Sequence, residues 1–171
     1  ANVTRTIAML GGKPVYTGVV SDDFYGGLYD TKVKEAGVKS LIKKKSGGMT
    51  GTSVILTTQD AERTMLTNLG ICRDYSKNEI DTAVLKESNI FHTSGYKWDT
   101  PSQKEAVEFA MDFALKNNIM VSFDIADPFC IERNVSDFKK IISKYVTILF
   151  GNKEEVKILT GKDDPVEAGK E

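Results

Sequence analysis

The sequence contains little of what several classes of protein require. It has only two cysteines, Cys72 and Cys130, without a C-x-x-C pair, and a single histidine, His92. These counts exclude a structural zinc cluster and leave room for at most one disulfide, which fits a reducing compartment. No apolar run approaches the roughly 18 residues of a membrane-spanning helix, and no signal-peptide pattern opens the chain. We therefore expect a cytoplasmic protein that does not enter a membrane.

An excess of either charge is also absent, because 23 Lys and Arg residues stand against 24 Asp and Glu residues. No overall field attracts nucleic acid or an anionic membrane, so we expect neither as a partner. The three lysines at residues 43–45 are the only charge run, and the edge of a solvated strand explains them better than a phosphate site. The 171 residues, 40% of them hydrophobic, are enough for one globular domain.

Neither glycine-rich phosphate-binding spacing, G-x-x-x-x-G-K-[ST] or G-x-G-x-x-G, occurs in the chain. The second absence argues against a nicotinamide-dependent oxidoreductase. His92 stands in the middle of an expected strand, where a hydrogen-bonded core residue is a better interpretation than a catalytic base.

Strands and helices alternate from residue 76 onward. Ser76 and Glu79 form the capping-box pattern of a helix start, and Thr100, Pro101 and Gln103 form a second one before apolar residues at helical spacing. The other expected elements are, in chain order, strand 90–94, a helix end at Asn117 and Asn118, strand 119–124, a helix capped by Asn134, strand 146–150 and a helix from Asn152 to Gly161.

This order predicts a parallel sheet with helical crossovers, in which ligands bind at the carboxyl ends of the strands. Those ends carry Ser94, Asp124 and Asn152. Asp124 and Asp127 follow a buried strand, where an acid either binds a ligand or caps a loop. Asn152 and Glu155 either face a ligand together or form a helix cap with a Glu that matches the helix dipole.

The first 70 residues combine an α/β segment with a β-rich one. A helix over residues 3–10 and strand 14–20 are followed by a helix that begins at Asp22 and Asp23. The expected buried face of that helix is Phe24, Leu28, Val33 and Ala36. Residues 54–58 and 64–68 predict a hairpin with polar positions on one face, and thus a β flap attached to an α/β body.

Several motifs resemble those of the phosphofructokinase-B (ribokinase-like) kinases. Residues 146–161 are similar to the segment in which a buried strand of these kinases leads to Asn-x-x-Glu, and residues 124–129 and 94–96 resemble the adenosine-kinase branch. Residues 50–53, 62–64 and 68–70 are similar to the substrate lid of the family. The family's N-terminal run is matched by Gly18, Asp22, Tyr25, Gly26 and residues 36–38. These motifs follow the family order over nearly the whole chain.

The resemblance implies an α/β fold, with a ribokinase-like three-layer α/β/α body, a parallel sheet and a small β lid. Residues 1–171 would then be a partial kinase domain, with the lid hairpin over 53–69 and a βαβαβ part of the core over 76–171. The family's Gly-Gly segment is expected before Ala1, and its Gly-Ala-Gly-Asp loop, which carries the catalytic base, after Glu171. On this alignment the chain lacks the catalytic Asp, and we expect it to be inactive by itself.

The resemblance also implies a function, the transfer of the γ-phosphoryl group of ATP, with Mg²⁺, to a hydroxyl of an adenosine-like nucleoside. A sugar kinase of the ribokinase or fructokinase type and a non-catalytic ligand-binding protein are the alternatives, and a homodimer is an assembly that the family allows. Arg63 would contact the transferring phosphate, and Asn2 and Tyr96 would contact the substrate. Asn152 and Glu155 would organise phosphate and magnesium, Glu155 through water. Asp124 and Asp127 are further site candidates, and the rings of Tyr96, Phe129 and Tyr25 either stack on a purine or fill the core.

Overall fold

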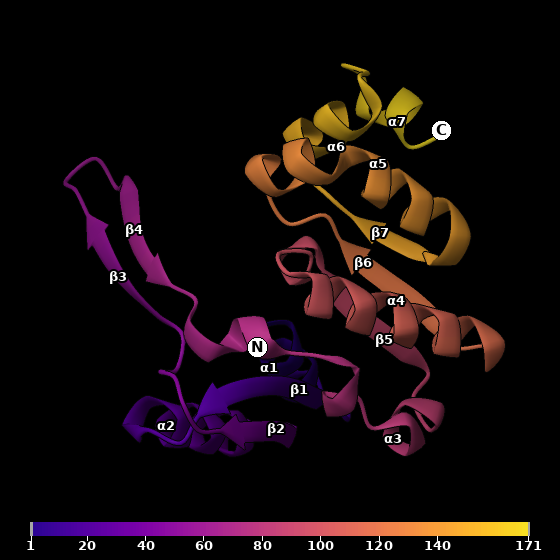
Figure 1. Ribbon diagram of the computed structural model, residues 1–171. Coiled ribbons are helices and arrows are strands. Elements are labelled where there is room, and N and C mark those ends of the chain that lie inside the picture. The colour runs from indigo at the N-terminus through magenta and orange to yellow at the C-terminus, as the bar shows by residue number, and fades with distance from the viewer. Residues whose placement is uncertain (1, 171) are drawn as a thin grey trace. The chain divides into compact units, whose positions relative to one another are not determined.

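The computed structural model describes residues 2–170 (Figure 1). The chain divides into two compact units, Ala1–Tyr75 and Ser76–Glu171. The boundary falls just before the capping box that starts at Ser76. The second unit therefore begins where the alternation of strands and helices is expected from the sequence.

The first unit opens with a parallel pair of strands joined by a helix. Its elements are α1 (Asn2–Met9), β1 (Val15–Ser21), α2 (Phe24–Glu35) and β2 (Lys39–Lys45), with β1 parallel to β2. All three lysines of residues 43–45 lie in β2, as expected for a strand edge.

The buried face of α2 differs in part from the expected one. Val33 is buried as expected, but Phe24 and Leu28 are 76% and 43% exposed, and Gly26 is buried instead. The reason is the close approach of the helix to β1, because a Cβ atom on Gly26 would lie only 2.1 Å from the carbonyl oxygen of Ser21. Gly26 and Val33 are seven residues apart, on one side of the helix, and that side contacts the strand.

The expected hairpin is present as β3 (Thr52–Thr57) and β4 (Arg63–Asn68), followed by a 3-10 helix, η1 (Gly70–Asp74). The strands are antiparallel, with Val54 opposite Leu66 and Ile55 opposite Met65. Because successive side chains alternate, these two pairs lie on opposite faces. The expectation of one polar face is therefore wrong, and all four apolar side chains are 52–60% exposed.

The second unit contains three parallel strands in the order β5-β6-β7. Its elements are η2 (Lys77–Glu79), α3 (Thr82–Lys86), β5 (Ile90–Ser94), η3 (Gly95–Lys97), α4 (Pro101–Lys116), β6 (Met120–Asp124), α5 (Pro128–Tyr145), β7 (Ile148–Phe150), α6 (Lys153–Thr160) and α7 (Pro165–Ala168). None of the helices in residues 2–170 combines the length and the apolarity needed to cross a membrane.

Most helix ends of this unit follow the capping signals. The capping box of Thr100 and Gln103 opens α4, and Asn118, with φ of +58°, turns the chain after it. The box of Ser76 and Glu79 caps only η2, and a second cap, Asp81, opens α3. The sequence predicts one short helix there. The structure instead has two separate helical turns, η2 and α3, because each of the two caps starts a turn.

Helix α5 begins earlier than expected. Asp127 is its N-cap and Pro128 its first residue, so Asn134 lies inside the helix instead of capping it. Asn134 has φ −134° and ψ 20°, and its side-chain Nδ2 donates to the carbonyl oxygen of Cys130 at 2.9 Å. This side chain competes for the carbonyl four residues earlier, which kinks the helix.

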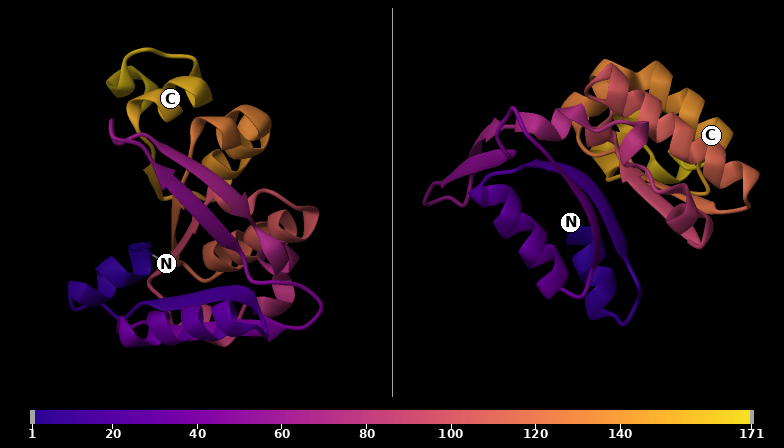
Figure 2. Two further views of the ribbon diagram at one scale, coloured as in Figure 1. Left: turned by 90° about the vertical axis from the view of Figure 1, so that its left-hand side faces the viewer. Right: turned by 60° about the horizontal axis from the view of Figure 1, so that its bottom comes forward.

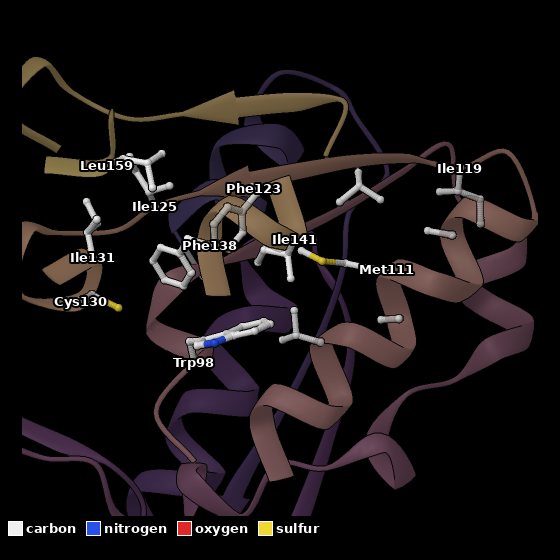
Figure 3. Packing of buried hydrophobic residues seen from close by; sticks show 14 of the residues in the cluster. Trp98, Met111, Ile119, Phe123, Ile125, Cys130, Ile131, Phe138, Ile141 and Leu159 are labelled. Carbon is white, nitrogen blue, oxygen red and sulfur yellow. The ribbon is translucent and has the colours of Figure 1, made fainter. Parts of the chain in front are cut away.

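The core of the second unit lies between the sheet and the two long helices. Figure 2 shows α4 and α5 side by side, and Figure 3 shows the buried side chains that they enclose with β6. Phe138 is fully buried, with its ring centroid 5.2 Å from that of Phe123 and 6.0 Å from that of Trp98. Lys104 of α4 also pairs with Asp137 of α5 at 3.0 Å, which joins the helices at their rim.

Two phenylalanines of α5 provide a matched test of this core. Phe138→Ala should lower the free energy of unfolding by about 3–5 kcal/mol, because it opens a cavity among well-packed rings. Phe129→Ala should cost less than about 1 kcal/mol, because Phe129 is 66% exposed. Urea unfolding followed by the fluorescence of the single tryptophan, Trp98, measures both. Equal losses from the two variants would contradict this packing.

Candidate functional site

The three parallel strands of the second unit end on one line. Ser94, Asp124 and Phe150, their last residues, are paired in register. The peptide nitrogen of Ile125 also donates to the carbonyl oxygen of Phe150 at 3.0 Å, beyond the last pair. The expectation that the carboxyl ends gather polar side chains at one edge of the sheet is therefore confirmed for Ser94 and Asp124. Asn152 is the second residue after the end of β7.

Two glycines keep the loops at this edge close together. A Cβ atom on Gly95 would lie 2.7 Å from the carbonyl oxygen of Ile125, and one on Gly151 would lie 2.6 Å from the Cδ1 atom of the same residue. A larger residue at position 95 requires a shift of the backbone, and one at position 151 requires the side chain of Ile125 to move. The loops after β5 and β7 therefore both pack against the loop after β6.

Asp124 and Asp127 both act as caps in the loop after β6. Asp124 Oδ1 accepts the N–H of Ala126 at 3.0 Å, and Asp127 Oδ1 accepts the N–H of Cys130 at 2.8 Å. Between them Ala126 has φ of +83°, a left-handed conformation that costs a residue with a Cβ about 1–3 kcal/mol. Both acids therefore cap the backbone, as one of the two interpretations expects. Their role in ligand binding stays a prediction, which the strained backbone at Ala126 supports.

Tyr96 lies beside Asp127. Desolvation of its hydroxyl, a hydrogen bond to Asp127 and the nearby carboxylate charges raise the pKa of Tyr96 to about 12. The hydroxyl therefore keeps its proton at neutral pH, and the ring is 61% exposed. Tyr96 offers an aromatic surface to solvent at the edge of the sheet.

Phe129 presents a second aromatic surface, at the start of α5. Its ring is 66% exposed, and the guanidinium of Arg133 stacks on it with 4.4 Å to the ring centroid. Tyr25, in the first unit, is 56% exposed. None of the three aromatic side chains fills the core of the described residues, and their stacking on a purine stays a prediction.

Asn152 and Glu155 form a complete capping box at the start of α6. The backbone N–H of Asn152 donates to Glu155 Oε2 at 2.8 Å, and its side-chain Nδ2 donates to Oε1 at 2.7 Å. In return the N–H of Glu155 donates to Asn152 Oδ1 at 2.9 Å. Glu155 is only 7% exposed, so the box fixes both side chains in one geometry beside the end of β7.

The donor set at this edge bears on magnesium. Within residues 2–170 no cluster of three or more His, Cys, Asp or Glu residues is arranged to hold a metal ion. Magnesium in kinases is commonly bound through few carboxylates, several waters and substrate phosphates. Each oxygen of Glu155 accepts one hydrogen bond here and keeps further acceptor capacity. These residues fit magnesium held through water and do not fit a cage of protein ligands.

His92 and Cys130 have structural environments. Nδ1 of His92 lies 2.9 Å from Ser122 Oγ, and burial lowers the pKa of His92, which favours the neutral ring. The thiol of Cys130 donates to the carbonyl oxygen of Gly95 at 3.1 Å, and burial raises the pKa of this thiol. A protonated, hydrogen-bonded thiol is a poor nucleophile.

Arg63 and Asn2 lie in the first unit. Both are exposed, Arg63 at the start of β4 opposite Thr57 and Asn2 at the start of α1. Among the described residues Arg63 makes no ion pair, not even with the nearby acids Asp60 and Glu62. The predicted contacts of both residues with substrate and phosphate stay predictions.

One polar cluster, formed by Ser21, Asp23 and Thr50, is not predicted by the sequence analysis. The carboxylate of Asp23 caps α2 and also binds Thr50, which stands 27 residues later. The family motif drew attention to the neighbouring Asp22, whose side chain is exposed. A paired Asp-Asp before a helix was the only local signal, and it does not reveal a distant partner.

Comparison with known proteins places this geometry in a family. A protein-family model described as pfkB family carbohydrate kinase matches residues 1–171. An uncharacterized sugar kinase of Archaeoglobus fulgidus is 26% identical over 162 residues, which cover 92% of this chain and 61% of that protein. A 5-dehydro-2-deoxygluconokinase of Photobacterium profundum is 26% identical over 161 residues, or 91% of this chain and 49% of that protein.

Solved structures show the same relationship. Adenosine kinase from Sinorhizobium meliloti superposes with a TM-score of 0.92 at 31% identity over 98% of this chain and 52% of that one. A probable sugar kinase from Rhizobium etli CFN 42 gives a TM-score of 0.93 at 32% identity, over 99% and 52%. The chain spans between about half and three fifths of the length of these relatives. Its fold is the ribokinase-like α/β fold that the sequence predicts, and the chain belongs to the pfkB family of carbohydrate kinases.

Proposed function

We propose that the protein of which this chain is part is a phosphotransferase that uses ATP and phosphorylates a hydroxyl of an adenosine-like nucleoside. One observation carries the choice of acceptor. Two exposed aromatic side chains, Tyr96 and Phe129, stand beside the carboxylates of Asp124 and Asp127 at the carboxyl edge of the sheet. Membership of the pfkB family supports the reaction class.

This combination suits a nucleoside because its two halves need different contacts. A purine stacks on an exposed aromatic ring, an interaction of about 1–3 kcal/mol per base. Ribose hydroxyls donate hydrogen bonds, which carboxylate oxygens accept. The likeness to the adenosine kinase from Sinorhizobium meliloti, at 31% identity, supports the same acceptor class.

A sugar acceptor is the second candidate. The similar proteins named as sugar kinases or 5-dehydro-2-deoxygluconokinases favour it. Carboxylates serve sugar hydroxyls equally well, so Asp124 and Asp127 do not separate the two acceptors. The exposed ring of Phe129 is the feature that favours a nucleoside.

Asn152 and Glu155 are proposed to organise the phosphate end of the reaction. When bound, Mg²⁺ neutralises charge on the phosphates and orients them. Glu155 would hold waters around the ion through the free acceptor capacity of its carboxylate, and Asn152 keeps that carboxylate oriented. Arg63, carried on the hairpin, would neutralise charge on the transferring phosphoryl group. We assign the general base to neither Asp124 nor Asp127, because each acts as a backbone cap.

A screen of acceptors tests the proposed function. The full-length protein, supplied with MgATP, should consume ATP with adenosine and form the nucleoside monophosphate, and it should do so faster than with ribose or fructose. Faster turnover of a sugar would establish the second candidate. Binding of adenosine without turnover under any condition would support a non-catalytic protein of this fold.

The acceptor site is tested by removal of one aromatic ring. Phe129→Ala should raise KM for adenosine at least about tenfold, because a stacked base loses about 1–3 kcal/mol, while KM for ATP stays unchanged. Phe109→Ala is the matched control, since Phe109 is also exposed, at 39%, but lies on α4 away from the strand ends. An unchanged KM for adenosine in Phe129→Ala would refute the stacking role.

Magnesium dependence separates the two roles of the capping box in α6. Glu155→Gln and Asn152→Leu should each lower turnover at least about tenfold, roughly 1.4 kcal/mol of transition-state stabilisation, and raise the magnesium concentration needed. Loss of the cap should also cost about 1 kcal/mol of stability. Thr100→Ala breaks the equivalent box of α4 and should cost similar stability with no change in the magnesium titration. A lower melting temperature with an unshifted magnesium titration in the α6 variants would leave capping as their only role.

Arg63→Ala should weaken catalysis more than folding. The side chain is exposed and makes no ion pair among the described residues, so its loss should leave the melting temperature nearly unchanged. We expect at least a tenfold fall in kcat, about 1.4 kcal/mol. Glu62→Ala, the adjacent exposed charge, is the control and should retain the wild-type kcat. Normal turnover of Arg63→Ala would remove Arg63 from the catalytic scheme.

A further inference from the structure

The hairpin β3–β4 has little packing of its own. Every residue of its two strands is exposed except Thr52, which is half-buried. Within the first unit it extends away from β1 and α2 (Figure 1). An isolated two-stranded hairpin is at best marginally stable in water. Its direction must therefore be set where the two strands join the rest of the unit.

The two ends of the hairpin are locked to each other. The N–H of Ile71 donates to the carbonyl oxygen of Met49 at 2.9 Å. A Cβ atom on Gly70, which has φ of +53°, would lie 2.2 Å from that same oxygen. One on Gly51 would lie 2.7 Å from the carbonyl oxygen of Leu69. The chain entering β3 and the chain leaving β4 thus meet backbone to backbone and form one base for the hairpin.

Thr50 ties this base to β1 and α2. Its N–H donates to Asp23 Oδ2 at 2.8 Å, and its hydroxyl donates to Asp23 Oδ1 at 2.6 Å. The same hydroxyl oxygen accepts the N–H of Ser21, the last residue of β1, at 3.0 Å. Ser21 makes a second hydrogen bond to this segment, in which its Oγ donates to the carbonyl oxygen of Gly48 at 2.6 Å. Thr50 is 6% exposed, and its bond with the Ser21 N–H is buried. The bonds to Asp23 are partly buried.

Asp23 is held in its charged form by the same contacts. Hydrogen bonds from the Thr50 hydroxyl, the Thr50 N–H and the Gly26 N–H keep the pKa of this carboxyl below its usual range. Hydrogen bonds to an ionised acceptor are about twice as strong as neutral ones. The helix cap and the hairpin base therefore share the Asp23 carboxylate, and the end of β1 is joined to them through the Thr50 hydroxyl.

We propose that Thr50, bound by the Asp23 carboxylate, is a positioning residue that fixes the direction in which the hairpin β3–β4 leaves the first unit, and through it the location of Arg63. The first part of the proposal, the anchoring of the hairpin, rests on the contacts of Thr50 and does not need the proposed function. The consequence for Arg63 rests on the proposed function.

Two pairs of variants isolate this anchor. Thr50→Val keeps the shape of the side chain and removes its hydroxyl, which leaves the Ser21 N–H without its acceptor. Thr50→Ser keeps the hydroxyl and is the matched control. Asp23→Asn alters the carboxylate that binds Thr50, whereas Asp22→Asn changes the adjacent, exposed acid, whose recorded partner is Lys44 at 3.9 Å.

Hydrogen exchange of the full-length protein tests the anchoring. Thr50→Val should exchange at least tenfold faster than Thr50→Ser at the backbone amides of residues 51–57 and 63–71. Rates in the β1–β2 ladder should stay unchanged except at Ser21, whose N–H loses its acceptor. Equal rates in the two variants, or an equal rise in β1–β2, would overturn the proposal, since the second result signals general destabilisation. If Thr50→Val does not fold, the exchange rates of Asp23→Asn and Asp22→Asn are compared in its place. Asp23→Asn should then show the faster exchange in the hairpin.

Kinetics test the consequence for Arg63. Thr50→Val should lower kcat at least fivefold with KM for the acceptor unchanged, and it should have no further effect in an Arg63→Ala background. Additive effects of the two substitutions, or an unchanged kcat, would overturn the link to Arg63. If the wild-type protein phosphorylates no acceptor, the proposed function fails, and the exchange experiment still decides whether Thr50 anchors the hairpin.

Discussion

The α-helices that come directly after a strand in residues 2–170 must satisfy backbone N–H groups at their first turn, and a short polar side chain does so in each of them. Asp23 caps α2, Asp127 caps α5 and Asn152 caps α6. Because parallel strands end at one edge of their sheet, these caps bring carboxylates and amides to the edge where α/β proteins bind ligands. The polar residues of the candidate site are thus required by the fold before any ligand is considered.

The same capping residues also orient the side chains to which we assign functional roles. Glu155 is oriented by Asn152 with acceptor capacity left over, and Asp127 holds the hydroxyl of Tyr96 while it caps α5. Cap formation places Phe129 in the first turn of α5, where its ring stays exposed. The same side chains therefore have a structural role and a proposed functional role. Measurements of KM or of the magnesium requirement separate the two roles, whereas measurements of stability do not.

Local signals explain what the sequence predicts well. Strand 90–94 and the box at Thr100 depend on neighbours within a few residues, and both agree with the structure. The start of α5 was misplaced because Asn134 imitates a cap that Asp127 provides. The buried face of α2 was misjudged because the close approach of Gly26 to β1 is a tertiary effect. The contact of Thr50 with Asp23 spans 27 residues, and no periodicity reveals such a pair.

The central claim is that the carboxyl edge of β5-β6-β7 binds the acceptor. The most direct test is a titration of the isotopically labelled full-length protein with adenosine, followed by the NMR chemical shifts of its backbone amides. The account predicts that, within this chain, the largest shifts occur at residues 94–97 and 125–130, around the exposed rings of Tyr96 and Phe129. Saturable shifts elsewhere in the protein, with these two loops unaffected, would contradict it.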